Sequence, residues 1–247
     1  VALGAVLLAQ GTPFLHAGSE LLRSKSLDRD AYRSGDWFNA IDWTGARTRW
    51  GVGLPPEGSN PDERVLLAEL LRAIPAPAPR HIRRCRDHVL ALLRVRRSSP
   101  LFGLPTAAAV HEHLRFQLTG PAARPGQVVW SLHGRGRADH DLLLVLNAAP
   151  EPLSAPPADL ELAWSEEDAA AASSPRPDRA APSPVEDWTL HPRLAALGDP
   201  VLGRARCDAR GLEVPPRTAG VFVRPRRGPT TPTGRRPGGL APDGPAA

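Results

Sequence analysis

Hydrophobic residues are spaced differently in the first and second parts of the chain. Residues 1–10 are apolar on nearly every side, which predicts a helix that is buried all round. Residues 12–17 form a short apolar run and predict a strand, with Pro13 near its start, where proline is tolerated. Residues 21–56 then follow neither a helical nor a strand period. A long non-repetitive segment inside a compact domain is usually a functional loop, so we expect a site there.

Two amphipathic helices are predicted after this loop. Asn60, Pro61 and Glu63 resemble a helix start, with an N-cap, a first-turn proline and a capping-box acid. Residues 81–97 predict a second helix with an arginine-rich face, which is most simply a solvated face. The buried stripes are expected at Leu67, Leu70, Leu71 and Ile74 in the first helix, and at Ile82, Cys85, Val89, Leu92 and Leu93 in the second.

From Pro105 onwards the hydrophobic period changes to two, which is typical of half-buried strands. Strands are predicted near Leu114, Phe116 and Leu118, and at residues 127–133, 141–147, 160–164, 185–190, 204–208, 212–215 and 218–223. Residues 134–136 are a plausible hairpin loop. Strands separated by turns in this way predict an antiparallel β-sandwich. Residues 166–184 and 224–247 have biased composition and no apolar period, so a disordered insertion and a disordered tail are predicted.

Composition narrows the class of protein. At 247 residues and 41% hydrophobic content, most of the chain can bury a core. The net charge of +5 is modest for this length, so it does not indicate nucleic-acid binding. Cys85 and Cys207 lie far apart, which excludes a disulfide framework and fits a reducing compartment. The chain begins at Val1, contains no methionine and shows no signal-peptide layout. We therefore expect a piece of a longer protein, with a cytoplasmic or plastid-type compartment favoured.

Aromatic residues are concentrated in the long loop. Tyr32, Trp37, Trp43 and Trp50 lie there among carboxylates, an amide and arginines. Aromatic faces suit the C–H side of a sugar ring, and charged groups hydrogen-bond its hydroxyls. Alternatively, the tryptophans pin the loop to the domain and the charges pair with one another. The spacing alone leaves both interpretations open.

Other groups of residues in the sequence indicate a catalytic or metal site less strongly. Asp28 with Asp30, or Asp36 with Asp42, offers the paired carboxylates that glycosidases use. Two histidine-containing clusters lack the ligand spacing of a metal site, so no metal is expected. They are His111, Glu112 and His113, expected on a strand, and His133 with Asp139, His140 and Asp141.

Several longer motifs carry a family resemblance. The run GTPFLHAGSELLRSKSLDRDAYRSGDWFN at residues 11–39 is long and specific. Shorter motifs follow at residues 41–43, 50–56, 97–102, 104–106, 190–192 and 214–223. Together they resemble the pullulanase-type α-1,6-glucosidases, which include limit dextrinases and belong to the α-amylase superfamily. The resemblance covers roughly residues 1–223.

This resemblance implies an α/β plus all-β fold. Residues 1–104 would form the C-terminal end of a catalytic (β/α)8 barrel, with its last strand at residues 12–17 followed by helices. Residues 105–223 would form a C-terminal antiparallel β-sandwich. The implied activity is hydrolysis of α-1,6-glucosidic branch links in pullulan, starch or glycogen-derived dextrins, with retention at the anomeric carbon. The family's nucleophile, acid/base and stabilising acid follow earlier barrel strands, so they are expected upstream of Val1 and this fragment is expected to be inactive alone.

The resemblance further implies that the loop after the last strand borders the sugar subsites. Substrate contacts are expected at Asp28, Arg29, Asp30 and Tyr32, whereas Trp37, Phe38, Trp43 and Trp50 are expected to pack and shape the loop. The expected partner is a branched α-glucan, with no cofactor, metal, nucleic acid or membrane. Two alternatives are a carbohydrate-binding or structural module without catalytic activity, and a nucleic-acid-binding protein.

Overall fold

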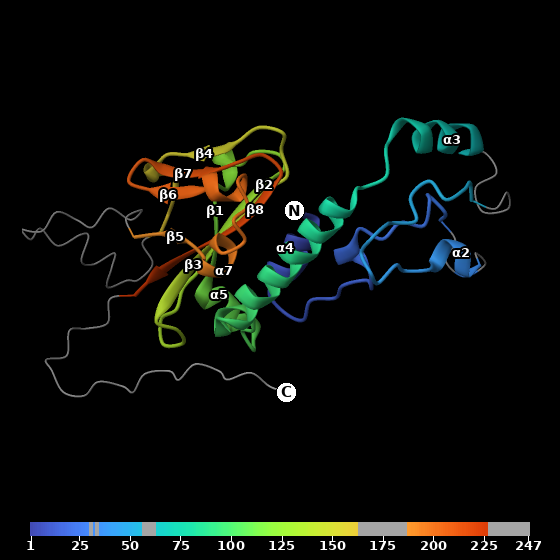
Figure 1. Ribbon diagram of the computed structural model, residues 1–247. Coiled ribbons are helices and arrows are strands. Elements are labelled where there is room, and N and C mark those ends of the chain that lie inside the picture. Colours follow the sequence, from blue (N-terminus) through green and yellow to red (C-terminus); the bar gives the residue numbers. More distant parts are fainter. Residues whose placement is uncertain (30–31, 33–34, 56–62, 163–186, 227–247) are drawn as a thin grey trace, which may run out of the picture.

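The second half of the chain forms two antiparallel sheets (Figure 1). The computed structural model describes residues 1–29, 32, 35–55, 63–162 and 187–226. Sheet A has the strand order β1 (Leu114–Gln117), β2 (Gln127–Leu132), β3 (His140–Asn147), β8 (Thr218–Pro225) and β5 (Thr189–Leu190). Sheet B has the order β4 (Leu153–Ala155), β7 (Gly211–Val214) and β6 (Arg206–Asp208). Buried residues of both sheets belong to one hydrophobic core, so the predicted antiparallel organisation is confirmed.

Strand β3 is buried on both faces because sheet A lies between two layers. Asn147 donates from its side chain to the carbonyl of Val214 in sheet B. On the opposite face, a Cβ placed on Gly4 would lie only 2.9 Å from the Cβ of Ala219 and 3.5 Å from Leu146. Side chains alternate along a strand, so β3 can supply leucines to both layers. Glycine at position 4 therefore lets a helix approach sheet A closely.

Two longer helices and several short ones complete the described chain. The helices are α1 (Ala2–Leu8), α2 (Asp36–Asn39), α3 (Arg64–Ala73), α4 (Pro79–Arg97), α5 (Ala107–His113) and α7 (Pro192–Ala195). The 3-10 turns are η1 (Ser19–Leu21), η3 (Pro100–Phe102), η4 (Gly120–Ala122), η5 (Pro157–Asp159) and η6 (Leu202–Arg204). None of the helices in the described ranges has both the length and the apolar character needed to cross a membrane.

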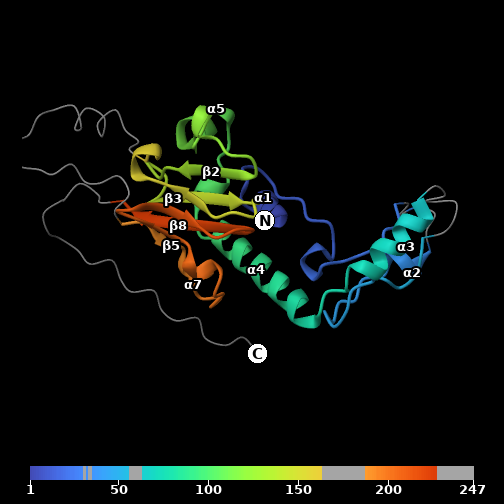
Figure 2. The same cartoon turned by 90° about the horizontal axis from the view of Figure 1, so that it is seen from above.

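Helix α4 connects the sheets to the rest of the molecule. It packs against α1 and α7 near the sheets and against η1 farther along. Figures 1 and 2 show α2 and α3 at the end of α4 that lies away from the sheets. Ile82, Val89 and Leu92 are buried as the stripe predicts, whereas Cys85 is only half-buried. The predicted second helix is thus confirmed, and it begins two residues earlier than expected.

The N-terminal prediction is correct for the helix and wrong for the strand. Helix α1 forms, but only Gly4, Leu7 and Leu8 are buried, so it is not covered on all sides. Residues 12–17 form no strand. An isolated apolar segment cannot form a ladder without a neighbouring strand, and within the described ranges all ladders lie in sheets A and B.

Two further predictions in the second half need correction. His111, Glu112 and His113 lie at the end of α5 rather than on a strand, because Thr106 caps a helix by accepting from the backbone of Ala109. The strand predicted at residues 160–164 is not formed in its described part, residues 160–162. The predicted insertion at residues 166–184 lies outside the described residues. The tail predicted at residues 224–247 was placed too early, because β8 continues to Pro225, and its part beyond residue 226 lies outside the described residues.

A side chain explains why residues 160–162 form no ladder. The Gln117 amide donates to the Glu161 carbonyl at 3.1 Å and accepts from the Glu161 amide at 2.8 Å. Gln117 therefore satisfies the backbone groups that a neighbouring strand would otherwise bond. The amide also donates to the buried Ser131 on β2, which fixes its orientation.

Candidate functional site

The long loop is attached to α4 through a small apolar contact. Leu21 and Ile82 are both buried. A Cβ on Gly45 would lie 3.6 Å from Ile82 and 3.8 Å from Leu21. Gly45 has a positive φ of 67°, which glycine adopts without strain. Two parts of the loop that are distant in sequence therefore meet on one side of α4.

Polar contacts fold the loop back on itself. Arg23 donates to the Asn39 carbonyl at 2.6 Å and pairs with the His16 ring at 3.0 Å. The Ser26 hydroxyl is buried and donates to the Gly53 carbonyl at 2.6 Å. These bonds join the beginning and the end of the loop and help to hold the segment between them, in which α2 is a short helix.

The four predicted sugar-contacting residues have different environments. Asp28 is buried, and its backbone amide donates to the Lys25 carbonyl at 3.1 Å. Arg29 is exposed and pairs with Glu63 at 3.4 Å, which links the loop to the beginning of α3. Tyr32 is 96% exposed. Asp30 lies outside the described residues. Arg29 and Tyr32 thus present polar and aromatic groups to solvent, whereas Asp28 does not.

The loop tryptophans divide between packing and exposure. Trp50 donates from its indole to the Ile74 carbonyl at 2.7 Å and so joins the loop to the end of α3. The Arg49 guanidinium lies 4.5 Å from the centroid of the Trp37 ring, although Trp37 is still 57% exposed. Trp43 is 67% exposed. The packing interpretation therefore fits Trp50, while Trp43 has an open face.

Phe14 is an exposed aromatic residue that the sequence patterns did not single out. It is 87% exposed, although the apolar run around it predicted a buried strand. The signal that could have drawn attention to it was its place in the specific motif at residues 11–39.

Asp42 is held in a local turn. Its carboxylate accepts from the Thr44 hydroxyl and from the backbone amides of Thr44 and Arg47. The hydrogen bond from the Thr44 side chain is the largest influence, and the pKa of Asp42 is lowered. A carboxyl kept ionised in this way is poorly suited to act as a general acid. Asp36 lies in the first turn of α2 and is exposed.

Two residues of the second histidine-containing cluster, His133 and Asp141, belong to a buried polar network beside the β2–β3 hairpin, whereas the side chain of Asp139 is exposed. Burial lowers the pKa of His133 to about 3, so the ring stays neutral and pairs with the Ser131 hydroxyl. Burial opposes ionisation of Asp141, but the Gly134 amide and the guanidiniums of Arg224 and Arg226 outweigh it and lower its pKa. These groups bind one another and hold the hairpin to β8.

The described part of the chain holds no cluster of side chains arranged to bind a metal ion. Among its His, Cys, Asp and Glu side chains, no group of three or more is placed to hold an ion. His113 lies instead within hydrogen-bond distance of the His133 carbonyl, at 2.6 Å, and accepts from Arg137 at 3.2 Å.

Three residues near the end of α4 are connected like a hydrolytic triad. The His140 ring lies 2.9 Å from the Ser99 hydroxyl and 2.9 Å from the Asp139 carboxylate. Ser99 is buried, however, and its oxygen caps η3 by accepting from Leu101. Neither of the two cavities described below is lined by Ser99. This group therefore joins the end of α4 to β3, with the buried Ser99 hydroxyl engaged by Leu101 and His140.

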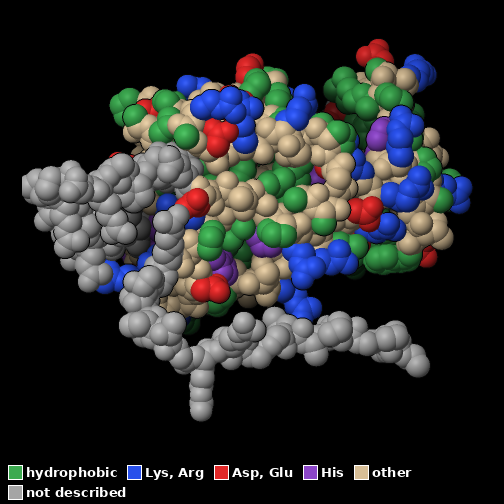
Figure 3. All heavy atoms as spheres, turned by 60° about the vertical axis from the view of Figure 1, so that its left-hand side comes forward, with side chains coloured by type: hydrophobic (Ala, Val, Ile, Leu, Met, Phe, Trp, Pro, Cys, Tyr) green, Lys and Arg blue, Asp and Glu red, His purple; other side chains and the backbone are tan. Residues whose placement is uncertain are grey.

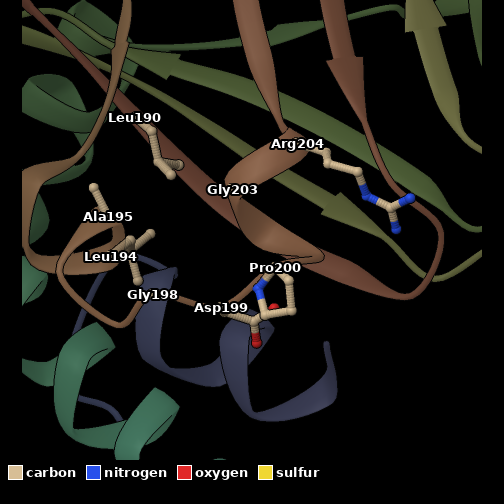
Figure 4. Close-up of a pocket in the computed structure, with 8 residues that line it drawn as sticks. All are labelled: Leu190, Leu194, Ala195, Gly198, Asp199, Pro200, Gly203 and Arg204. Atoms are coloured by element: carbon tan, nitrogen blue, oxygen red, sulfur yellow. The ribbon is translucent and has the colours of Figure 1, made fainter.

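Two hollows lie near Asp199, away from the loop. One, of about 350 Å³, is lined by β5, α7, η6 and the turn between the last two (Figure 4). The other, of about 310 Å³, lies between α1, α4 and β8. On the face drawn in Figure 3, Lys and Arg side chains form several separate groups with acidic and hydrophobic side chains among them.

The family model for pullulanase-type α-1,6-glucosidases, C-terminal, matches residues 45–225. The chain belongs to this family. It is 38% identical over 237 residues to the chloroplastic pullulanase 1 of Arabidopsis thaliana, with 90% of this chain and 22% of that protein covered. It is 33% identical over 158 residues to a pullulanase of Klebsiella pneumoniae, with 61% of this chain and 14% of that protein covered. The resemblance inferred from the motifs is therefore confirmed.

Solved pullulanases share the fold. PulA from Klebsiella oxytoca has a TM-score of 0.76 at 26% identity, with 92% of this chain and 20% of that chain covered. PulA from Klebsiella pneumoniae in complex with maltotriose has a TM-score of 0.74 at 26% identity, with 92% of this chain and 23% of that chain covered. The chain thus spans about a fifth of the length of these pullulanases and corresponds to part of a debranching glycoside hydrolase.

Proposed function

We propose that this chain is the C-terminal portion of an enzyme that cleaves α-1,6-glucosidic branch links in pullulan, starch or glycogen-derived dextrins. The observation that carries the proposal is the family match over residues 45–225. The likeness to a pullulanase solved with maltotriose supports a glucan as the partner. The proposal covers the branch links of all three of these α-glucans.

Within that enzyme, residues 1–104 form the end of a catalytic (β/α)8 barrel, and residues 105–223 form a C-terminal β-sandwich. The exposed apolar side chains of Phe14, Val65 and Leu66 support the first assignment, because the rest of a barrel would cover them. Residues 12–17 form no ladder in this chain, but they have the apolar character of a barrel strand and would find ladder partners in the rest of the barrel.

The nucleophile, the acid/base and the stabilising acid lie upstream of Val1, so this chain alone does not hydrolyse glucans. The environments of Asp28 and Asp42 support this division, because Asp28 is buried and Asp42 is bound in its own turn. In the whole enzyme, hydrolysis proceeds with retention through a covalent intermediate, which requires two carboxyl groups close together.

The loop contributes sugar contacts rather than bond cleavage. Arg29 donates to sugar hydroxyls, Tyr32 offers its ring face to a pyranose, and Asp30 is the third contact. The exposure of Arg29 and Tyr32 supports this role directly. Asp28 would act through the shape of the loop, because its side chain is buried.

Hydrolysis of pullulan by two proteins tests the proposal. One is this chain, and the other is a version extended upstream to include the remaining barrel strands. We expect the extended protein to release reducing sugar ends and this chain to release none. Activity of the short chain would contradict the placement of the acids upstream. An inactive extended protein that still binds maltotriose would favour the alternative of a carbohydrate-binding module.

A further inference from the structure

Arg96 on α4 donates hydrogen bonds to backbone carbonyl groups in two segments that lie far apart in the sequence. Its guanidinium donates to the carbonyls of Leu7 at 2.9 Å, Ala9 at 2.6 Å and Phe102 at 3.0 Å, and also to that of Gly11. It lies 5.8 Å from the centroid of the Phe102 ring. Arginine suits this position because its planar group carries five donors in a fixed arrangement, which one ammonium group cannot reproduce.

Helix α1 depends on this contact because it lacks a cap of its own. The last carbonyls of a helix have no partners within the helix. Here Ala9 leaves the helix in an extended conformation, with φ −66° and ψ 160°, and the last turn contains no basic residue. Arg96 therefore supplies both donors and a positive charge at the C-terminal end of α1, where a cation is favoured.

Gln10 makes a second connection between the same two segments. Its side-chain amide donates to the Leu101 carbonyl at 2.7 Å and accepts from the Leu104 backbone amide at 3.3 Å. Arg96 and Gln10 thus bind residues 7–11 to residues 101–104 by side-chain-to-backbone bonds in both directions. We call this pair of side chains the α1 clamp.

The loop begins directly after the α1 clamp. Gly11 has a positive φ of 83°, and residues 12–17 form no ladder in the described structure. Farther along the chain, Leu15 packs against the core and η1 packs against α4, where Leu21 meets the region of Ile82. The position at which the chain enters the loop is therefore set by the bonds of the clamp.

We propose that Arg96 is a positioning residue for the glucan-binding loop, acting through the α1 clamp. The inference rests on the proposed function for the loop's role, but not for the clamp itself. Arg96 bonds to backbone carbonyls and lies beside the Phe102 ring, so it affects substrate through the placement of the residues that follow Gly11. A small misplacement of binding groups in an enzyme site can cost up to about 100-fold in rate.

Amide hydrogen exchange of this chain tests the clamp without reference to activity. For Arg96→Gln we expect exchange at residues 5–11 to rise roughly tenfold, as the loss of one to two net hydrogen bonds requires. Exchange in β3 and β8 should stay unchanged. The matched control is Arg97→Gln, since Arg97 is the next residue on α4 and is exposed. Unchanged exchange at residues 5–11 in Arg96→Gln would overturn the clamp.

Gln10→Leu keeps the clamp testable if Arg96→Gln does not fold. This variant removes two hydrogen bonds and leaves Arg96 in place. We expect the same residues to exchange faster, with β3 and β8 still protected. A folded Gln10→Leu protein with wild-type exchange at residues 5–11 and 101–104 would count against the clamp.

Kinetics of the longer enzyme test the positioning role. With Arg96→Gln we expect KM for a short branched maltooligosaccharide to rise about tenfold, with a smaller change in kcat, because ground-state contacts are loosened. Arg96→Lys should recover only part of the affinity. A purely structural role would instead lower the active fraction and leave KM unchanged, which would overturn the proposal. If the unaltered longer enzyme cleaves no α-1,6 links, the proposed function fails, while the exchange result still decides the clamp.

Discussion

The Asp199 carboxylate lies 2.6 Å from the Arg84 guanidinium and joins α4 to the turn before η6. The same carboxylate accepts from the backbone amides of Val201 and Leu202, so it also caps that turn. The Asp199 side chain is only 5% exposed, whereas that of Arg84 is 55% exposed. The two partners should therefore contribute unequally to stability.

We expect Asp199→Ala to lower the free energy of unfolding by about 1–2 kcal/mol, because a cap and an ion pair are lost together. Arg84→Ala should cost less, within about 1 kcal/mol, since the Arg84 side chain is largely exposed and Asp199 keeps its backbone partners. Urea denaturation measures both, with Arg83→Ala as an exposed control on the same helix. An Asp199→Ala protein as stable as the control would contradict the capping role.

His133 gives stability a defined dependence on pH. Its folded-state pKa of about 3 lies below the ordinary value of 6.5, so below pH 6.5 the unfolded chain binds a proton that the folded chain excludes. The free energy of unfolding should therefore fall as the pH decreases from 6.5 towards 3, by up to about 1.4 kcal/mol per pH unit for this group.

Replacing His133 isolates its share of this dependence. Burial also lowers the pKa values of His88 and His191, so their contributions have the same sign and remain. His133→Gln should reduce the slope between pH 6.5 and 4, while His111→Gln, at an exposed position, should leave it unchanged. Equal slopes in both variants, measured by urea denaturation at several pH values, would exclude His133 as a source.

The Gln117 amide should be important for stability, although it lies outside the site. In Gln117→Leu the backbone groups of Glu161 and the buried Ser131 hydroxyl lose partners, which should cost about 1–3 kcal/mol. Glu161→Gln is the matched control because both bonds involve the backbone of residue 161 and its side chain is exposed. If Gln117→Leu unfolds at the same temperature as that control, the contact is dispensable.

The proposed sugar contacts make a prediction for the longer enzyme. Tyr32→Ala should weaken maltotriose binding by about two- to tenfold, the range expected when one aromatic contact is lost. Tyr32→Phe should retain most of the affinity because it keeps the ring. Asp30→Ala should lower kcat/KM for branched oligosaccharides. Isothermal titration and steady-state kinetics measure these effects, and wild-type values in Tyr32→Ala and Asp30→Ala would remove both residues from the site.

Periodic patterns predicted the parts of the fold that are stabilised by regular faces. The buried stripe of α4 was visible because packing along a helix repeats at a fixed interval. Strands β2 and β3 were visible as short apolar runs of strand length. The strand at residues 12–17 was wrong because an apolar run does not reveal whether a partner strand is present. His113 was predicted on a strand, but it belongs to the helix that begins after the Thr106 cap and continues to residue 113.

The candidate site was predictable only through the motif at residues 11–39. Three side chains hold the loop, and each donates a hydrogen bond to a backbone carbonyl that is distant in sequence. They are Arg23, Ser26 and Trp50. Such bonds produce no periodic pattern of residues in the sequence. Arg96 was hidden for the same reason, since its place on an arginine-rich helix suggested a solvated side chain rather than a bond to Leu7.

The layer that α1 and α4 form over sheet A determines where this protein can be divided. Leu142 and Leu144 of β3 share one core with Leu7 and Leu92, which precede residue 104 in the chain. A protein cut to begin at residue 105 would expose that face of the sheet, and exposed apolar faces of this kind promote association. We expect residues 105–226 alone to aggregate, and residues 1–226 to stay monodisperse in gel filtration. The minimal folding unit would then begin at α1, so the proposed boundary between barrel and sandwich at residue 104 would not be a boundary of folding.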